Sequence, residues 1–143
     1  MIVARLLKQK GQDVFSVSPD STVRHALEQL VENRVGSLLV RSGEDVVGII
    51  TERDIIRNGL TGGRLLADQR VEEIMSRDVL IATPSDSLQY VMKVMTRSKI
   101  RHMPVYDEGK LVGLVSIGDL VFSMLEESAD EIRHLNDYIS GSW

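Results

Sequence analysis

The segment Val47-Gly48-Ile-Ile-Thr51-Glu-Arg-Asp54 returns 65 residues later as Val112-Gly113-Leu-Val-Ser116-Ile-Gly-Asp119. A second segment, Val14-Phe-Ser-Val-Ser-Pro19, returns at the same offset as Val79-Leu-Ile-Ala-Thr-Pro84. The apolar positions between these segments stay in step without a gap. Such internal similarity is typical of two copies of one supersecondary unit that pack against each other. The sequence therefore predicts two equivalent repeats, and two equivalent clefts, related by a pseudo-twofold axis.

Each repeat has the apolar spacing of a β-α-β-β-α unit. In the first repeat we expect a strand over 15–17, a helix from a cap at Asp20 or Ser21 to Asn33, a hairpin of strands 37–41 and 46–50, and a helix from Thr51. In the second repeat we expect a helix over 86–98, a hairpin of strands 102–106 and 110–115, and a helix from Ser116. A helix over 2–10 and a helical turn over 71–75 precede the two repeats.

The predicted fold class is α+β, with tandem β-α-β-β-α repeats and an extended C-terminal helix. Each repeat would be a small mixed sheet with helices to one side. We divide the chain into an N-terminal helix and lead-in (1–13), the first repeat (14–65), the second repeat (66–125) and a C-terminal helical extension (126–143).

The last helix carries an apolar stripe that continues past the end of the repeat. Val121 and Leu125 belong to the stretch expected to pack, and Ile132, Leu135 and Ile139 extend the same stripe. Nothing within the repeat is left to cover this extension. The helix either folds back over its own domain or forms a subunit interface, and we favour the interface and a homodimer.

Composition narrows the function classes. A net charge of −4 and a pI near 5.4 argue against a nucleic-acid partner. The chain has no cysteine, and its three histidines lack metal-site spacing, so we expect no metal site. We find neither a secretory signal nor an apolar run near the eighteen or so residues that span a membrane. We therefore expect a cytoplasmic location and no membrane partner.

The duplicated Gly-h-h-(Ser/Thr)-x-x-Asp motif (h, apolar), together with the order of elements, resembles the cystathionine-β-synthase (CBS) domain pair, also called a Bateman module. The segment Ile100-Arg-His-Met-Pro-Val105 matches the strand-leading segment of that family, whereas Leu39 replaces the proline found at position 104. The resemblance covers about residues 5 to 125. It implies a regulatory sensor that has no catalytic cofactor and binds an adenosine-containing ligand, such as AMP, ADP, ATP, S-adenosylmethionine or NAD(H), between the repeats.

The resemblance also implies roles for single residues. The motif aspartate would bind the ribose hydroxyls, and the Ser/Thr with the adjoining helix start would bind phosphate. On this pattern one cleft would combine Ser116, Gly118, Asp119 and Arg101 with Gln12, Val14, Val35, Gly36 and Ser37. The other would combine Thr51, Arg53 and Asp54 with Arg77, Val79, Ile100 and His102, and the adjoining Met103 and Pro104 complete the predicted set.

These residue types suit that chemistry, but they also have a simpler interpretation. A helix start offers unpaired N–H groups to a phosphate, and a carboxylate can accept from both ribose hydroxyls. Thr51-x-x-Asp54 and Ser116-x-x-Asp119 equally fit a capping box that only closes a helix start. The two roles can coexist, because a carboxylate has two oxygens.

Differences between the repeats predict unequal clefts. Arg53 stands where the second repeat has Gly118, so one cleft gains a cation that either binds phosphate or is solvated, and the other gains space. AMP, ATP or NAD(H) are the favoured ligands, with a regulated target protein in trans. Two alternatives stay open: a structural dimerisation module with vestigial sites, and a small nucleotide hydrolase. The hydrolase is disfavoured because phosphate-binding loops and paired catalytic residues are absent from the sequence.

Overall fold

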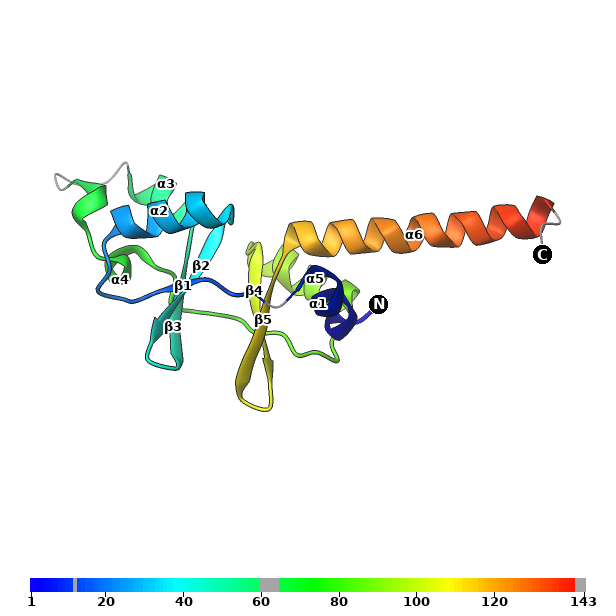
Figure 1. Ribbon diagram of the computed structural model, residues 1–143, viewed down its shortest axis with the longest axis horizontal. Helices are drawn as coiled ribbons and strands as arrows, with labels where there is room; N and C mark the ends of the chain where they lie inside the picture. The colour runs from blue at the N-terminus through cyan, green and yellow to red at the C-terminus, as the bar shows by residue number, and fades with distance from the viewer. Residues whose placement is uncertain (12, 60–64, 141–143) are drawn as a thin grey trace. The chain divides into compact units, whose positions relative to one another are not determined.

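A computed structural model describes residues 1–11, 13–59 and 65–140 of the chain. The chain divides into two compact units (Figure 1). The first-repeat unit is Val14–Val79. The second-repeat unit joins Met1–Asp13 to Leu80–Trp143. Both units mix small sheets with helices, so the predicted α+β class is confirmed.

The first-repeat unit holds a three-stranded sheet in the order β1-β2-β3. Strand β1 is parallel to β2, and β2 is antiparallel to β3. Its elements along the chain are β1 (Ser16–Val17), α2 (Val23–Asn33), β2 (Ser37–Ser42), β3 (Asp45–Thr51), α3 (Glu52–Asn58), the 3-10 turn η1 (Leu66–Asp68) and α4 (Val71–Ile74).

The second-repeat unit repeats this plan with a shorter sheet. Its elements are α1 (Val3–Lys10), α5 (Leu88–Ser98), β4 (His102–Asp107), β5 (Lys110–Ser116) and α6 (Ile117–Ser140). A single parallel bridge between Ala82 and Val105 replaces the β1–β2 pairing. That bridge lies 65 residues after the pair Val17 and Val40 of the first repeat.

The strand register repeats with the same offset. Ser37 pairs with Thr51, and His102 pairs with Ser116. Each hairpin shifts register at the same place, after Val40 and after Val105. Arg34 and Lys99, at the ends of α2 and α5, both have φ of 55°. The duplication seen in the sequence is thus a duplication of backbone geometry.

The start of α2 corrects one expectation. Thr22, and neither Asp20 nor Ser21, is the N-cap, and its hydroxyl accepts from the His25 N–H at 3.2 Å. The hydroxyl of Ser18 donates to Asp20 at 2.6 Å, so the Asp20 carboxylate serves the preceding turn instead. Helix α5 likewise begins at Leu88, capped by Ser87.

The helical segment before each repeat packs into the core of the other repeat. In the second-repeat unit, Val3, Leu6 and Leu7 of α1 lie in the buried cluster that contains Leu88 and Val105. In the first-repeat unit, Val71 and Ile74 of α4 lie in the cluster of Val23 and Ile50. The predicted turn over 71–75 is therefore present, but its apolar side chains complete the first repeat.

The motif glycines make this close packing possible. A Cβ on Gly48 would lie 2.8 Å from the backbone oxygen of Ser76 and 2.7 Å from Sδ of Met75. A Cβ on Gly113 would lie 2.7 Å from Cδ2 of Leu7. The repeated glycine is thus required by the segment packed against each hairpin.

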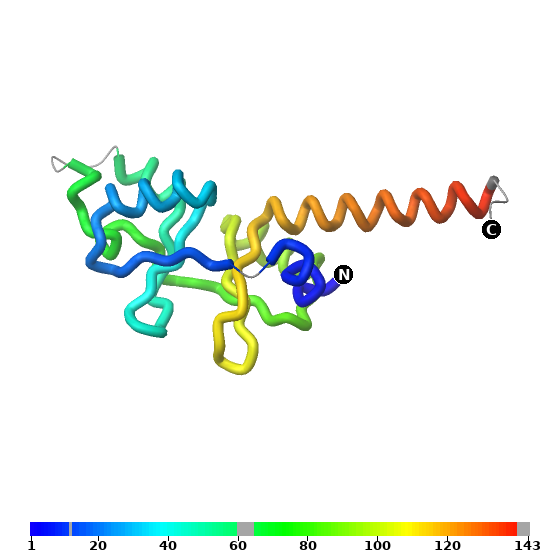
Figure 2. The backbone as a smooth tube through the Cα atoms, viewed as in Figure 1, coloured from blue at the N-terminus to red at the C-terminus, as the bar shows by residue number. Residues whose placement is uncertain are grey.

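Helix α6 does not fold back over its own unit. Ile132, Leu135 and Ile139 are 57%, 62% and 80% exposed, and α6 continues past α1 and α5 as one straight helix (Figures 1 and 2). The expectation that Val121 and Leu125 pack is also wrong, because both side chains are exposed. Within the described ranges no helix has the length and apolar composition needed to cross a membrane.

Candidate ligand-binding site

Each repeat ends its hairpin with a hydroxyl residue that begins a helix. Thr51 follows directly on β3 and caps α3, and its hydroxyl accepts from the Asp54 N–H at 3.2 Å. Ser116 ends β5, and its hydroxyl accepts from the Asp119 N–H at 3.1 Å. Because strand passes straight into helix, the hydroxyl, the first helical N–H groups and the carboxylate lie together in each repeat.

Asp54 is half-buried and uses both carboxylate oxygens. Its Oδ2 accepts from the Thr51 N–H at 2.9 Å and from the Thr51 hydroxyl at 3.1 Å, which closes a capping box. Its Oδ1 accepts from the Ser76 hydroxyl at 3.1 Å. Ser76 follows α4, so the segment packed against the hairpin also positions the motif carboxylate.

Asp119 closes the equivalent box but has a charged neighbour. Its Oδ2 accepts from the Ser116 N–H at 2.9 Å and from the Lys10 ammonium at 2.6 Å. Lys10 also donates to the carbonyl oxygen of Leu114 at 2.8 Å. Among the described residues no group bonds to Oδ1 of Asp119, and the side chain is 27% exposed. One carboxylate oxygen is therefore open to a ligand.

Opposing effects act on the ionisation of Asp119. Burial raises the pKa of this carboxyl group. Hydrogen bonds from Lys10 and from the Ser116 N–H, together with the positive charge of Lys10, outweigh burial and hold the pKa below its ordinary value of 3.8. Asp119 is thus a carboxylate at neutral pH and acts as a hydrogen-bond acceptor.

Six further predicted residues of the second-repeat unit lie on or next to the hairpin and the helix that form this capping box. His102 pairs with Ser116 across the hairpin, and the Arg101 carbonyl accepts from the Ile117 N–H at 2.8 Å. Gly118 is exposed, and a Cβ there would meet only Oγ of Ser116, at 3.6 Å, so the space beside Asp119 is open. Ile100 is half-buried. Met103 is 2% exposed and Pro104 is buried, which leaves mainly their backbone for a ligand.

The first-repeat unit holds the remaining predicted residues that the structure describes. Arg53 and Arg77 are exposed, and the Arg77 guanidinium donates to the Glu72 carbonyl at 3.1 Å. Ser37 is 3% exposed, so its hydroxyl lies inside the unit. Val14, Val35, Gly36 and Val79 are half-buried. Gln12 lies outside the described residues, and the assignment of all these residues to shared clefts stays a prediction.

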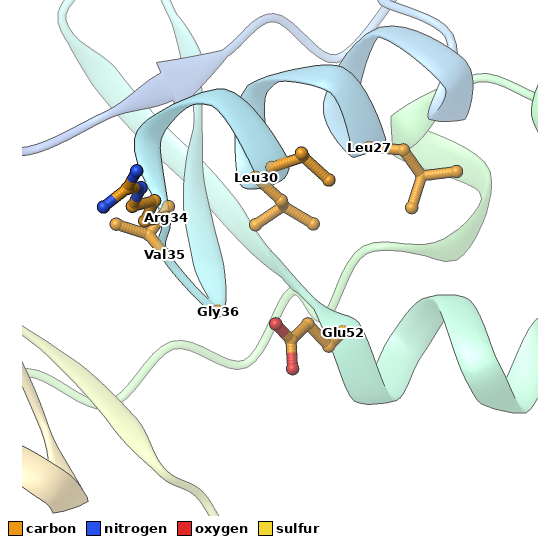
Figure 3. Close-up of a pocket in the computed structure, with 7 residues that line it drawn as sticks. Leu27, Leu30, Arg34, Val35, Gly36 and Glu52 are labelled. Carbon is orange, nitrogen blue, oxygen red and sulfur yellow. The ribbon is translucent and has the colours of Figure 1, made fainter.

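A groove of about 340 Å³ lies between α2 and the start of α3 (Figure 3). Leu30 and Arg34 line it from the side of α2, and Glu52 lines it from the start of α3 with its carboxylate directed toward α2. Val35 and Gly36 line it, whereas Thr51 and Asp54 do not. Because the groove lacks the motif carboxylate and hydroxyl, we give more weight to the capping boxes, where charge and donors converge.

Lys10 and Ser76, which donate hydrogen bonds to the two motif carboxylates, were not among the predicted site residues. A signal was present: each lies in the segment that precedes a repeat, and the 65-residue offset aligns Lys10 with Met75 and Gly11 with Ser76. The offset could not reveal that these segments pack against the other repeat. Among the described residues no group of three or more His, Asp or Glu is placed to bind a metal ion.

Comparison with known proteins agrees with this architecture. The protein-family model of the CBS domain matches residues 9–60 and 71–126 of this chain. The chain is 33% identical over 150 residues to the CBS domain-containing protein CBSX3, mitochondrial, of Arabidopsis thaliana. That alignment covers 99% of this chain and 73% of the relative.

Solved structures show the same fold. The CBS-domain containing protein ATU1752 from Agrobacterium tumefaciens superposes with a TM-score of 0.84 and 33% identity, over 87% of this chain and 99% of that chain. The crystal structure of CBSX2 in complex with AMP superposes with a TM-score of 0.72 and 24% identity, over 87% and 97% of the two chains. At that identity the second likeness concerns the fold alone.

Proposed function

This chain belongs to the CBS domain family, and from that premise we propose that it is a non-catalytic regulatory module that binds an adenosine-containing ligand. The ligand would bind at the two motif carboxylates, and binding would change how the protein packs against a second copy or a target in trans. We propose a cytoplasmic location on the sequence alone, although the Arabidopsis relative is named as mitochondrial.

One observation carries this proposal. In both repeats a carboxylate, a hydroxyl and the first N–H groups of a helix converge within hydrogen-bond distance of one another. Adjacent ribose hydroxyls and a phosphate need this combination of acceptor and donors. The duplication favours a ligand role, because a helix cap alone does not require the same triad twice in the same register.

Among adenosine ligands, we propose AMP, ATP and NAD(H) as the leading candidates. The CBSX2 complex supports AMP as a ligand of this fold. Exposed Gly118 and the cationic side chains Arg53 and Arg101 support a ligand that carries phosphate. S-adenosylmethionine is the less favoured candidate, because its sulfonium gains nothing from these cations.

Calorimetric titration with AMP, ATP, NADH and S-adenosylmethionine tests the proposal. We expect saturable heat from at least one of them. Asp119→Asn should weaken binding by about 10- to 100-fold, because an uncharged amide accepts less strongly from ribose hydroxyls. Asp107→Asn, at the exposed end of the hairpin, is the matched control and should bind as the parent protein does. Absence of heat from all four ligands at millimolar concentration would reject the sensor proposal.

A homodimer through α6 is part of the proposed function. Six positions of α6 alternate in steps of four and three: Val121, Leu125, Ser128, Ile132, Leu135 and Ile139. This spacing places them along one seam, as in helices that pair by knobs-into-holes packing. The five apolar side chains of the seam are all exposed in the single chain, between 44% and 80%. A second copy of α6 would cover them.

A structural dimerisation module with vestigial sites is the second candidate. The observation that favours it is that both motif carboxylates already serve as helix caps. In that case the Asp119→Asn protein would lose stability, while dimerisation and every ligand titration would match the parent protein. Ligand titration and thermal unfolding of the same variant therefore separate the two functions.

A further inference from the structure

The two motif carboxylates occupy equivalent positions but accept from different groups outside their capping boxes, at Oδ1 of Asp54 and at Oδ2 of Asp119. Ser76, a neutral hydroxyl, donates to Asp54 at 3.1 Å, whereas the Lys10 ammonium donates to Asp119 at 2.6 Å. Both partners come from the segment packed against the hairpin. The two sites therefore differ in charge at the atoms that would contact a ligand.

The charge difference is one full unit. In the first turn of α3 the charges of Glu52 and Arg53 cancel, which leaves the negative charge of Asp54. In the first turn of α6, Ile117 and Gly118 are uncharged, and Lys10 neutralises Asp119. An anionic ligand is repelled by an isolated carboxylate, and a partly buried site screens that repulsion less than open water does.

Lys10 can also bind a ligand directly. An ammonium has three N–H donors, and among the described residues Lys10 uses two, on Asp119 and on the Leu114 carbonyl. Its side chain is 32% exposed. The third donor can therefore reach a phosphate oxygen while the ion pair with Asp119 is kept.

From these contacts, and resting on the proposed function, we propose that Lys10 makes the Asp119 site selective for phosphate-bearing adenosine ligands. The Asp54 site, which has Ser76 in that place, discriminates less by ligand charge. One chain thus carries two sites of the same architecture with different preferences. A rise in phosphorylated ligand would fill the Asp119 site first.

The competing explanation is that Lys10 acts only as a structural link between the end of α1, strand β5 and the start of α6. A structural link would affect stability and all ligands alike. A selectivity role instead changes affinity in proportion to ligand charge. Adenosine, AMP and ATP form a series that differs only in the number of phosphate groups, so they separate the two explanations.

The experiment titrates this series into Asp54→Asn protein, in which only the Asp119 site is intact, with and without Lys10→Met. We choose methionine because Met75 stands at the equivalent position, 65 residues later, in the segment packed against the first repeat. We expect adenosine affinity to change by less than about twofold, AMP to weaken by about fivefold and ATP by more. Raising the salt concentration should shrink the loss. Lys8→Met, on the exposed side of the same helix, should leave the whole series unchanged.

Two further variants keep the test decisive. Lys10→Arg retains the charge and should restore the preference for ATP. If Asp54→Asn unfolds below the titration temperature, the same series in the otherwise unchanged chain should show one of two binding events losing its charge preference. Equal weakening of adenosine and ATP by Lys10→Met, or no weakening of either, overturns the inference and leaves the proposed function standing. A parent protein that binds none of the series overturns both.

Discussion

Asp119 connects the stability of the second repeat with its proposed binding role. Its Oδ2 accepts from the Ser116 N–H and from Lys10, while no group in the part of the chain that the structure describes bonds to its Oδ1. In the first repeat both oxygens of Asp54 accept hydrogen bonds, Oδ2 from Thr51 and Oδ1 from Ser76. At Asp119 the capping interpretation and the ligand interpretation of the motif are therefore compatible, because each uses a different oxygen of the carboxylate.

The low pKa of Asp119 predicts a pH-dependent contribution to stability. Because the carboxyl pKa is below its ordinary value of 3.8 in the folded protein, the stabilisation is present above that value and is lost as pH falls through the folded pKa. We expect Asp119→Asn to lower the free energy of unfolding by about 1 kcal/mol at pH 7, with the difference from the parent protein shrinking below about pH 4. Denaturant unfolding from pH 7 to pH 2.5 measures this.

Ser87→Ala provides the control for that pH dependence. It removes the N-cap of α5, whose hydroxyl accepts from the Tyr90 N–H at 3.1 Å, without removing a titrating group. Its cost, about 1 kcal/mol, should stay constant over the same pH range. A constant difference for Asp119→Asn as well would contradict the assignment of the ion pair with Lys10.

At the scale of elements, the segment before each repeat completes the other repeat. Helix α1 contributes Leu6 and Leu7 to the second-repeat core, and α4 contributes Val71 and Ile74 to the first. Neither compact unit is thus a self-contained repeat. The close approach to each hairpin explains why the motif begins with glycine and why the motif carboxylate gains a partner from the same segment.

This packing predicts unequal costs for two matched substitutions. In Gly48→Ala the new Cβ would meet the backbone oxygen of Ser76. That oxygen accepts from the Ile49 N–H at 2.9 Å, and the Ser76 N–H donates to the Ile49 oxygen at 2.9 Å, so the Ser76 backbone is held in place. In Gly113→Ala the new Cβ would meet the end of the Leu7 side chain, which can shift more easily. We expect losses of about 3 and about 1 kcal/mol in the free energy of unfolding, respectively. Equal losses in chemical denaturation would contradict this account of the motif glycines.

In the molecule as a whole, the seam of α6 is a row of apolar side chains that the single chain leaves exposed. Large exposed apolar patches on soluble proteins mark interaction surfaces. The seam runs along the helix beyond the part that packs on its own unit, where Leu120 is buried. We expect its partner to be the same seam of a second copy, because most soluble oligomers pair the same surface of identical subunits.

The dimer prediction is tested by sedimentation or light scattering. We expect the parent protein to be dimeric at micromolar concentration. The double substitution Ile132→Glu and Leu135→Glu should give a folded monomer, because it places charges on the seam. His134→Glu lies between them off the seam and should leave the mass unchanged. A parent protein that is monomeric, or a double variant that stays dimeric, would contradict the assignment of this interface.

The duplication, the order of elements and the positions of the motif carboxylates follow from the amino-acid sequence alone. These features are local or periodic: apolar spacing fixes helices and strands, and the 65-residue offset fixes which residues correspond. Two predictions were wrong, the cap of α2 and the burial of Leu125, because both depend on side-chain contacts and not on the spacing of apolar residues. The Ser18 hydroxyl in the preceding turn donates to Asp20, and Leu125 points away from the core of its unit and stays 64% exposed.

Which segment packs against which repeat, and so which side chain contacts each carboxylate, depends on the three-dimensional fold. Lys10 is 109 residues from Asp119 in the chain, and Ser76 is 22 from Asp54. A contact between residues so far apart in the sequence depends on which core α1 and α4 pack against with their apolar faces. The spacing of apolar residues does not indicate that packing. The net charge of the Asp119 site could therefore not be predicted from the sequence, because it depends on the lysine that the fold places beside the carboxylate.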